Sequence, residues 1–128
     1  MTKVSSVKTF ICLAIVLMLL FCGAASAANI DPDNDSSQWA WGENIGWLCF
    51  DPLFDPGVTV ADTELYGYVW AENIGWINLS CANRGTCDDV DYRVNNDGTG
   101  ILGGWAWGEN VGWISFSCEN RDTCADVD

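Results

Sequence analysis

One seven-residue pattern, Trp-x-Glu-Asn-Ile/Val-Gly-Trp, occurs three times in this chain of 128 residues. Its copies run from Trp41 to Trp47, from Trp70 to Trp76 and from Trp107 to Trp113. Recurrence of a fixed pattern at a spacing of a few tens of residues is the mark of a repeat architecture. The pattern must therefore be explained as part of a folding unit before it is considered as a site.

The residues around each copy favour strands joined by turns. Short runs rich in Trp, Tyr, Val and Ile, bounded by Gly, Asn and Asp, are typical of such segments. In the third copy we expect strands over 91–95, 100–107 and 113–117, with a turn at Asn95-Asn96-Asp97-Gly98. No stretch after residue 27 has a helical apolar period of useful length. The sequence predicts an all-β fold, an antiparallel meander of about three tandem three-stranded repeats, sandwich-like or solenoid-like and stapled by disulfides.

The chain divides into a leader, a linker and a repeat domain. Residues 1–27 have the features of a signal peptide: Lys3 and Lys8, an apolar run over 10–21, and Ala25-Ser26-Ala27 at the cleavage point. The apolar run is too short to span a bilayer comfortably. Residues 28–38 form an acidic linker, and 39–128 form the repeat domain, with copies at about 39–56, 57–90 and 91–128. We therefore expect an extracellular, cell-surface or periplasmic protein that is not inserted in the membrane after cleavage.

The charge of the chain restricts its partners. After residue 27, three arginines stand against 18 acidic residues, which gives a net charge of −15. Such a surface repels a phosphate backbone, so nucleic-acid binding is not expected. Cations, calcium among them, are the natural partners of an acidic surface, but we favour the simpler interpretation that the charge provides solubility outside the cell.

Five cysteines remain after residue 27, and an oxidising compartment makes them disulfide candidates. Cys81 to Cys87 and Cys118 to Cys124 bound two copies of one loop, so we expect each pair to close within its own repeat. Zinc is disfavoured because the chain has no histidine and this spacing is not usual for zinc ligands. Cys49 has no partner in this scheme. An odd thiol suggests either an intermolecular disulfide or a copy that has lost its mate.

The strand after each turn has two different faces. Leu48, Ile77 and Ile114 are expected to point into the core, while the tryptophans point to the opposite face. Exposed flat rings on a sheet would suit the binding of sugar rings. The alternative, which we favour from sequence, is that neighbouring units bury these rings between them. The candidate platform comprises Trp41, Trp47, Tyr68, Trp70, Trp76, Trp105, Trp107 and Trp113.

The glutamate of the pattern, which is Glu43, Glu72 and Glu109 in the three copies, invites a catalytic interpretation. One carboxylate per hairpin, with no histidine, no paired acid and no nucleophile motif, gives little support for acid–base chemistry, so we do not expect an enzyme. Turn geometry explains the pattern better, because Gly can take a left-handed conformation that closes a loop of three or four residues. The loop length decides whether the two tryptophans share a face. Arg84 and Arg121, at matching loop positions, are expected to pair with carboxylates.

The linker contains Asp31, Asp33 and Asp35, which resemble the start of a calcium loop because their carboxylates alternate. Ser36 stands where the EF-hand pattern requires Gly, and Gly42 stands where it has a bidentate Glu. Calcium remains the candidate cofactor of this segment, although we favour a solvated acidic linker.

Residues 103–116, Gly-Gly-Trp-Ala-Trp-Gly-Glu-Asn-Val-Gly-Trp-Ile-Ser-Phe, resemble the "GWAWxENIGWI" tandem repeats of exported bacterial proteins. The resemblance covers residues 39–128 and implies an extracellular repeat protein without catalytic residues, because that family has no established activity. We expect a non-enzymatic, secreted or cell-surface β-repeat protein with a structural or adhesive role. The alternative is a glycan-binding module that uses the Trp/Tyr face, with calcium assistance. Unpaired terminal strands, or Cys49, would allow self-association.

Overall fold

The computed structural model describes residues 27–52 and 57–124 of the chain. The expected signal peptide therefore lies, apart from Ala27, outside the described residues, as do residues 53–56 and 125–128. Within the described part, no helix has the length and apolar character needed to cross a membrane.

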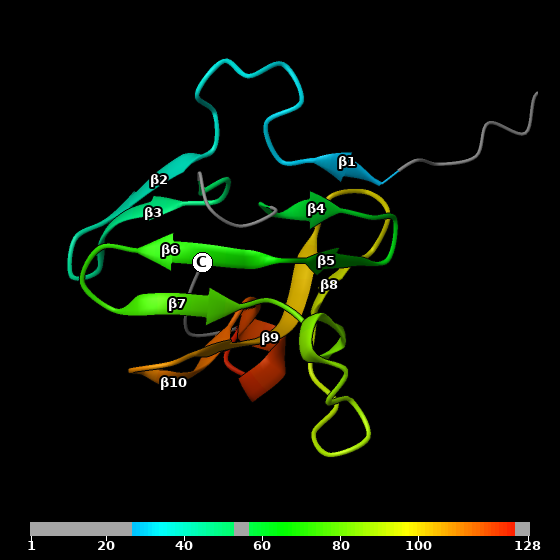
Figure 1. The fold of residues 1–128 in the computed structure, drawn as a ribbon. Coiled ribbons are helices and arrows are strands. Elements are labelled where there is room, and N and C mark those ends of the chain that lie inside the picture. Colours follow the sequence, from blue (N-terminus) through cyan, green and yellow to red (C-terminus); the bar gives the residue numbers. More distant parts are fainter. Residues whose placement is uncertain (1–26, 53–56, 125–128) are drawn as a thin grey trace, which may run out of the picture.

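The described chain is all-β, as expected, with ten strands hydrogen-bonded into one antiparallel sheet and two short 3-10 helices (Figure 1). The strands are β1 (Ala28–Asn29), β2 (Trp39–Gly42), β3 (Gly46–Cys49), β4 (Thr59–Val60), β5 (Glu64–Tyr66), β6 (Tyr68–Ala71), β7 (Gly75–Asn78), β8 (Val94–Asn96), β9 (Leu102–Gly108) and β10 (Gly112–Ser115). The 3-10 helices are η1 (Cys81–Arg84) and η2 (Cys118–Arg121).

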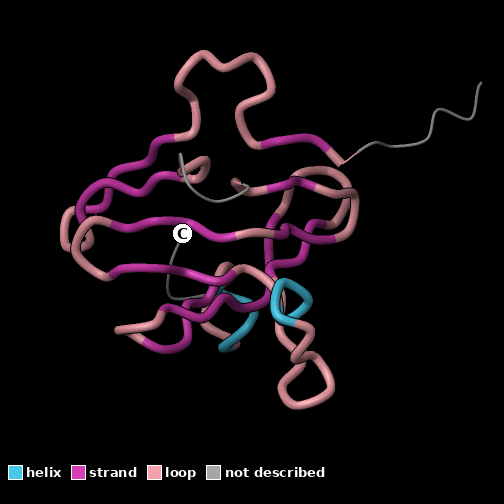
Figure 2. The backbone as a smooth tube through the Cα atoms, in the orientation of Figure 1, coloured by secondary structure: helices cyan, strands magenta, loops and turns pink. Residues whose placement is uncertain are grey.

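Three hairpins, β2–β3, β6–β7 and β9–β10, lie side by side and form a six-stranded meander in the order β2-β3-β6-β7-β9-β10 (Figures 1 and 2). The antiparallel meander is therefore confirmed. Three complete three-stranded units are not, because what recurs three times is the two-stranded hairpin. A further strand accompanies only the second and third hairpins. β4 pairs with β5, which leads into the second hairpin, and β8 pairs with the first part of β9 in the third.

The segments leading into the second and third hairpins bend at a glycine, which sends the chain from one half of the sheet to the other. Gly67 separates β5 from β6 with φ +100°, and Gly104 lies within β9 with φ +75°. A side chain is strained at such positive φ values, whereas glycine adopts them readily. The bends create a second half of the sheet, in the order β1-β4-β5-β8-β9, with β9 shared between the halves.

One hydrophobic core draws on both halves of the sheet. Leu65 and Val94 come from the second half, and Val69, Ile77 and Ala106 come from the meander. Leu48 and Ile114 pack against this core with partial burial, as the alternation of the strands predicted. The opposite face of the meander carries the aromatic rings, so the core fixes which way those rings point.

Both predicted disulfides are present and each closes its own loop, Cys81 with Cys87 and Cys118 with Cys124. The loops also have a common internal design. Ser80 and Ser117 cap η1 and η2 by accepting a hydrogen bond from a backbone N–H of the first turn. Each loop is therefore a compact unit attached to the end of a hairpin.

Among the residues that the structure describes, neither loop arginine has a carboxylate within ion-pair distance, so the expected pairing is not confirmed. The Arg84 guanidinium lies 5.9 Å from the centre of the Tyr68 ring, and that of Arg121 lies 5.6 Å from the Trp105 ring. Tyr68 and Trp105 occupy the same hairpin position, and a guanidinium over an aromatic ring gains a cation–π attraction. In the described part of the chain, Arg93 makes the ion pairs.

Candidate functional site

The three hairpin turns have identical geometry. In each hairpin the last residue of the first strand is paired with a glycine that begins the second strand, as Gly42 is with Gly46, and three residues lie between them. The glycine that begins the second strand has a φ of +75° to +77°. This confirms that glycine closes the turn in the left-handed conformation and settles the loop at three residues. The consequence is that the two tryptophans of each pattern stand directly opposite one another and share a face.

Within each hairpin the paired indole rings touch in an edge-to-face arrangement. The ring centres lie 5.1 Å apart for Trp41 and Trp47, and the two later pairs have separations of 5.1 and 4.9 Å. A further ring lies on the diagonal, with Trp39 at 6.3 Å from Trp47. Such pairs contribute roughly 0.5–1.5 kcal/mol beyond the area they bury, so the rings support one another's orientation.

The aromatic face is exposed, and the expectation that neighbouring units bury it is wrong. The hairpins associate edge to edge within one sheet, so no second layer formed by the described strands covers the rings. Trp76 and Trp105 are half-buried. The exposed tryptophans are Trp39 (48 %), Trp41 (61 %), Trp47 (50 %), Trp70 (41 %), Trp107 (40 %) and Trp113 (46 %).

A hollow of about 520 Å³ opens on this face between the first and second hairpins, lined by Trp39, Trp47, Trp70 and Glu72. The register places Cys49 directly between Trp39 of β2 and Trp70 of β6, and this thiol is buried. Trp39 is absent from the set of aromatic residues predicted as a platform. Trp39 stands two residues before the first tryptophan of its pattern, as Tyr68 and Trp105 do in theirs. This shared position is the sequence signal that identifies it.

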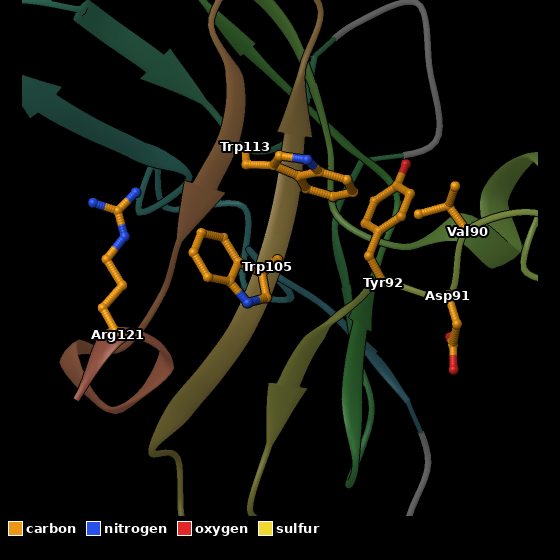
Figure 3. A pocket seen from close by; sticks show the side chains of 6 residues that line it. All are labelled: Val90, Asp91, Tyr92, Trp105, Trp113 and Arg121. Carbon is orange, nitrogen blue, oxygen red and sulfur yellow. The ribbon is translucent and has the colours of Figure 1, made fainter.

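A second hollow, of about 430 Å³, lies at the third hairpin and is lined by Val90, Asp91, Tyr92, Trp105, Trp113 and Arg121 (Figure 3). The Tyr92 ring stacks edge-on against Trp113 with centres 5.2 Å apart. Figure 3 shows the rings of Tyr92, Trp105 and Trp113 gathered together, while the Asp91 carboxylate points away from them. This hollow therefore offers one cation, Arg121, beside aromatic rings.

Tyr92 also reaches the gap between the second and third hairpins. Its hydroxyl accepts a hydrogen bond of 2.7 Å from the side-chain amide of Asn78. Asn78 holds, in the second hairpin, the place that Cys49 holds in the first. Burial raises the pKa of the Tyr92 phenol above its ordinary value. No sequence pattern pointed to Tyr92, because it lies in a segment with no counterpart among the described residues of the first copy.

The recurrent glutamate joins one hairpin to the next. We call the contact between the second strand of one hairpin and the first strand of the following one a hairpin joint. In the first joint the Glu72 carboxylate accepts a hydrogen bond from the backbone N–H of Trp47 at 3.2 Å, and the Glu72 N–H donates to the Trp47 carbonyl at 2.9 Å. In the second, Glu109 makes the same two bonds to Trp76, at 2.9 and 3.0 Å. The glutamates are exposed yet structurally engaged.

Asp31 does not present its carboxylate to solvent. It is buried, and its oxygens accept hydrogen bonds from the backbone N–H groups of Asp35 and Ser36 and from the hydroxyl of Ser37. Asp33 and Asp35 are exposed. Within the described ranges, the only group of three acidic or sulfur ligands close enough to hold a metal is Cys81, Cys87 and Asp91, whose two sulfurs are bonded to each other.

Cys49 is not the remnant of a lost disulfide pair, and that interpretation is wrong. It is opposite Trp39 in the first hairpin, as Asn78 is opposite Tyr68 and Ser115 opposite Trp105. The disulfide cysteines come three residues after Asn78 and Ser115, so Cys49 occupies a position on the aromatic face instead. Its burial leaves little of the thiol accessible to another chain.

Comparison with known proteins gives no identification, since no protein-family model, curated protein or solved structure matches the chain. What can be said of function therefore depends on the aromatic face and on the joints between hairpins.

Proposed function

We propose that the protein is a non-enzymatic, exported β-sheet protein with an adhesive role, and that the first hollow on its tryptophan face binds extracellular carbohydrate. The observation that carries the proposal is the first hollow, where Trp39, Trp47 and Trp70 stand exposed around an open cavity. Apolar rings in contact with water cost free energy, and a ligand that covers them and releases that water removes the cost.

The chemistry of the hollow favours a sugar over an apolar ligand. A sugar ring presents C–H groups on its faces, which pack against aromatic rings, and hydroxyls at its edge, which need hydrogen-bond partners. Glu72 lies on the rim and has carboxylate oxygens that accept such bonds. One of those oxygens is already held by the Trp47 N–H, which fixes the side chain before a ligand arrives.

The test is a titration of intrinsic tryptophan fluorescence with a panel of soluble glycans, supported by pull-down on insoluble polysaccharides. Trp70→Ala removes a wall of the first hollow, and we expect at least a tenfold loss of affinity, which is about 1.4 kcal/mol. Trp107→Ala is the matched control, because Trp107 is 40 % exposed against 41 % for Trp70 and lines neither of the two hollows. Equal losses in the two variants, or no binding across the panel, would count against the proposal.

Calcium assistance is a separate part of this proposal. If a calcium ion at Asp31, Asp33 and Asp35 stabilises the protein, excess calcium raises the melting temperature and a chelator lowers it. Asp33→Asn and Asp35→Asn should then abolish the calcium effect. A melting temperature that is the same in calcium and in chelator removes calcium from the proposal and leaves carbohydrate binding to be judged on the tryptophan variants.

A further inference from the structure

The two hairpin joints repeat one another in register as well as in their glutamate contacts. In the first joint Leu48 is opposite Ala71, and in the second Ile77 is opposite Gly108. In each case the residue just before the glutamate faces the residue just after the tryptophan. Since one geometry serves both joints, the second edge of any such hairpin is shaped to receive the first edge of another.

The turn glycines show which of these receiving edges are filled. A Cβ added at Gly46 would meet the side chains of Glu72 and Asn73 from the next hairpin, and one at Gly75 would meet those of Glu109 and Asn110. A Cβ at Gly112 would approach only the Trp107 ring of its own hairpin, at 3.9 Å. Within the described residues, the place beside Gly112 that a following glutamate would take is therefore vacant.

The two ends of the meander are complementary halves of the same joint. In the described structure β10 pairs with β9 alone, and β2 pairs with β3 alone. By the alternation of the ladder, the N–H and carbonyl of Trp113 face the free edge of β10, as those of Trp47 face Glu72. Glu43, at the other end, is exposed and has no partner in the part of the chain that the structure describes.

We infer that copies of this chain associate head to tail, with β2 of one copy paired to β10 of the next through a third hairpin joint. The internal joints specify the contacts. The Glu43 carboxylate of one copy accepts the N–H of Trp113 in the neighbouring copy, Gly42 lies opposite Ile114, and Trp41 lies opposite Ser115. The occupant of the vacant place beside Gly112 is thus the Glu43–Asn44 turn of a second copy.

Such a contact joins two different surfaces and leaves a free edge at each end, so it builds open chains of copies and not closed dimers. The aromatic face would continue across each contact, since Trp41 of one copy would follow Trp113 of the one before. The acidic charge of the chain opposes the contact at low ionic strength, and salt screens that repulsion. Association should therefore strengthen as salt is added.

The first test measures mass against concentration by sedimentation velocity and light scattering, at low and at moderate salt, on the oxidised protein. We expect species larger than a dimer whose proportion grows with concentration and with salt. Glu43→Ala should require roughly tenfold higher concentration to reach the same mean mass. Glu119→Ala is the matched control, because it removes one exposed carboxylate outside the two edges, and it should behave as the parent. A monomer at all concentrations, a dimer that grows no further, or equal behaviour of the two variants would overturn the inference.

The second test checks the register by disulfide trapping in a Cys49→Ser background. Trp41 and Ser115 lie on strands at opposite ends of the six-stranded meander, so cysteines at these two positions cannot meet within one copy. The double variant Trp41→Cys/Ser115→Cys should give a ladder of crosslinked copies on mild oxidation, and either single variant should remain monomeric on a non-reducing gel. Dimers from Ser115→Cys alone would show that β10 pairs with another β10, which contradicts the head-to-tail contact.

Discussion

Asn83 clamps the backbone of Gly67, sixteen residues earlier, from both sides. Its side-chain oxygen accepts the Gly67 N–H at 3.0 Å, and its amide nitrogen donates to the Gly67 carbonyl at 2.8 Å. Asn120 holds Gly104 in the same way in the next copy. Each disulfide loop thus supports the bend by which the chain crosses between the halves of the sheet.

Replacing Asn83 with Ala should destabilise the fold by about 1–3 kcal/mol, because the part-buried Gly67 N–H loses its partner, whereas the Gly67 carbonyl keeps its bond from the Leu79 N–H. The measurement is the free energy of unfolding from a denaturant titration. Asn44→Ala provides the control, since Asn44 is an exposed turn residue at the first hairpin. If Asn83→Ala unfolds at the same denaturant concentration as Asn44→Ala, the clamp does not support the bend.

The turn glycines allow a comparison in which backbone strain is constant and crowding differs. Gly75 and Gly112 both have φ +77°, so an alanine at either should cost about 1–2 kcal/mol. At Gly75 the added methyl group would also collide with the Glu109 carboxylate and displace it from the Trp76 N–H, whereas Gly112 has room. We expect Gly75→Ala to be the more destabilising by at least about 1 kcal/mol. Equal losses in dilute solution would contradict the joint geometry.

The repeated pattern was sufficient to predict the fold class, the hairpin turns and the disulfides, because each of these depends on a few neighbouring residues. The turn expected at residues 95–98 lies further along the chain, since Asn95 and Asn96 belong to β8. Gly112 closes its hairpin for a local reason, and Cys118 is close in sequence to Cys124. The alternation along each strand also identified the aliphatic face correctly. Local physical chemistry, visible in one copy, determines all of these features.

The features that the sequence could not predict depend on how the hairpins of one chain pack against one another. The tryptophans would be buried if the hairpins stacked face to face, and they are exposed because the hairpins pair edge to edge. Trp41 has the same neighbours in sequence in both arrangements. The joint of Glu109 with Trp76 spans 33 residues and has no local signature. The place of Cys49 is hidden from the sequence for a related reason, because its equivalence to Asn78 appears only in the register of the strands.

The buried thiol of Cys49 should be unreactive in the folded protein. It is 6 % exposed and lies between Trp39 and Trp70, so a thiol reagent can reach it only when the first hairpin opens. We expect slow modification under native conditions and rapid modification in denaturant, with a monomer on non-reducing gels. Rapid native labelling, or a dimer that reducing agent dissolves, would instead support a crosslink through Cys49.

The raised pKa of Tyr92 predicts a loss of stability in alkali. The folded protein keeps the phenol neutral at pH values where the unfolded chain, with an ordinary pKa of about 10, releases the proton. The contribution of Tyr92 is therefore complete below about pH 10 and is lost as pH rises through the higher pKa of the folded state. Tyr92→Phe should cost about 1 kcal/mol at neutral pH through the lost bond with Asn78, and the difference in free energy of unfolding from the parent should narrow above pH 10.

Denaturant titrations from pH 7 to 11, with tyrosinate absorbance followed in parallel, measure both effects. Tyr66→Phe is a second case of the same effect, because a hydrogen bond to Glu64 raises the pKa of Tyr66, and its gap to the parent should also narrow above pH 10. A gap between parent and Tyr92→Phe that stays constant with pH would show that Tyr92 ionises alike in both states.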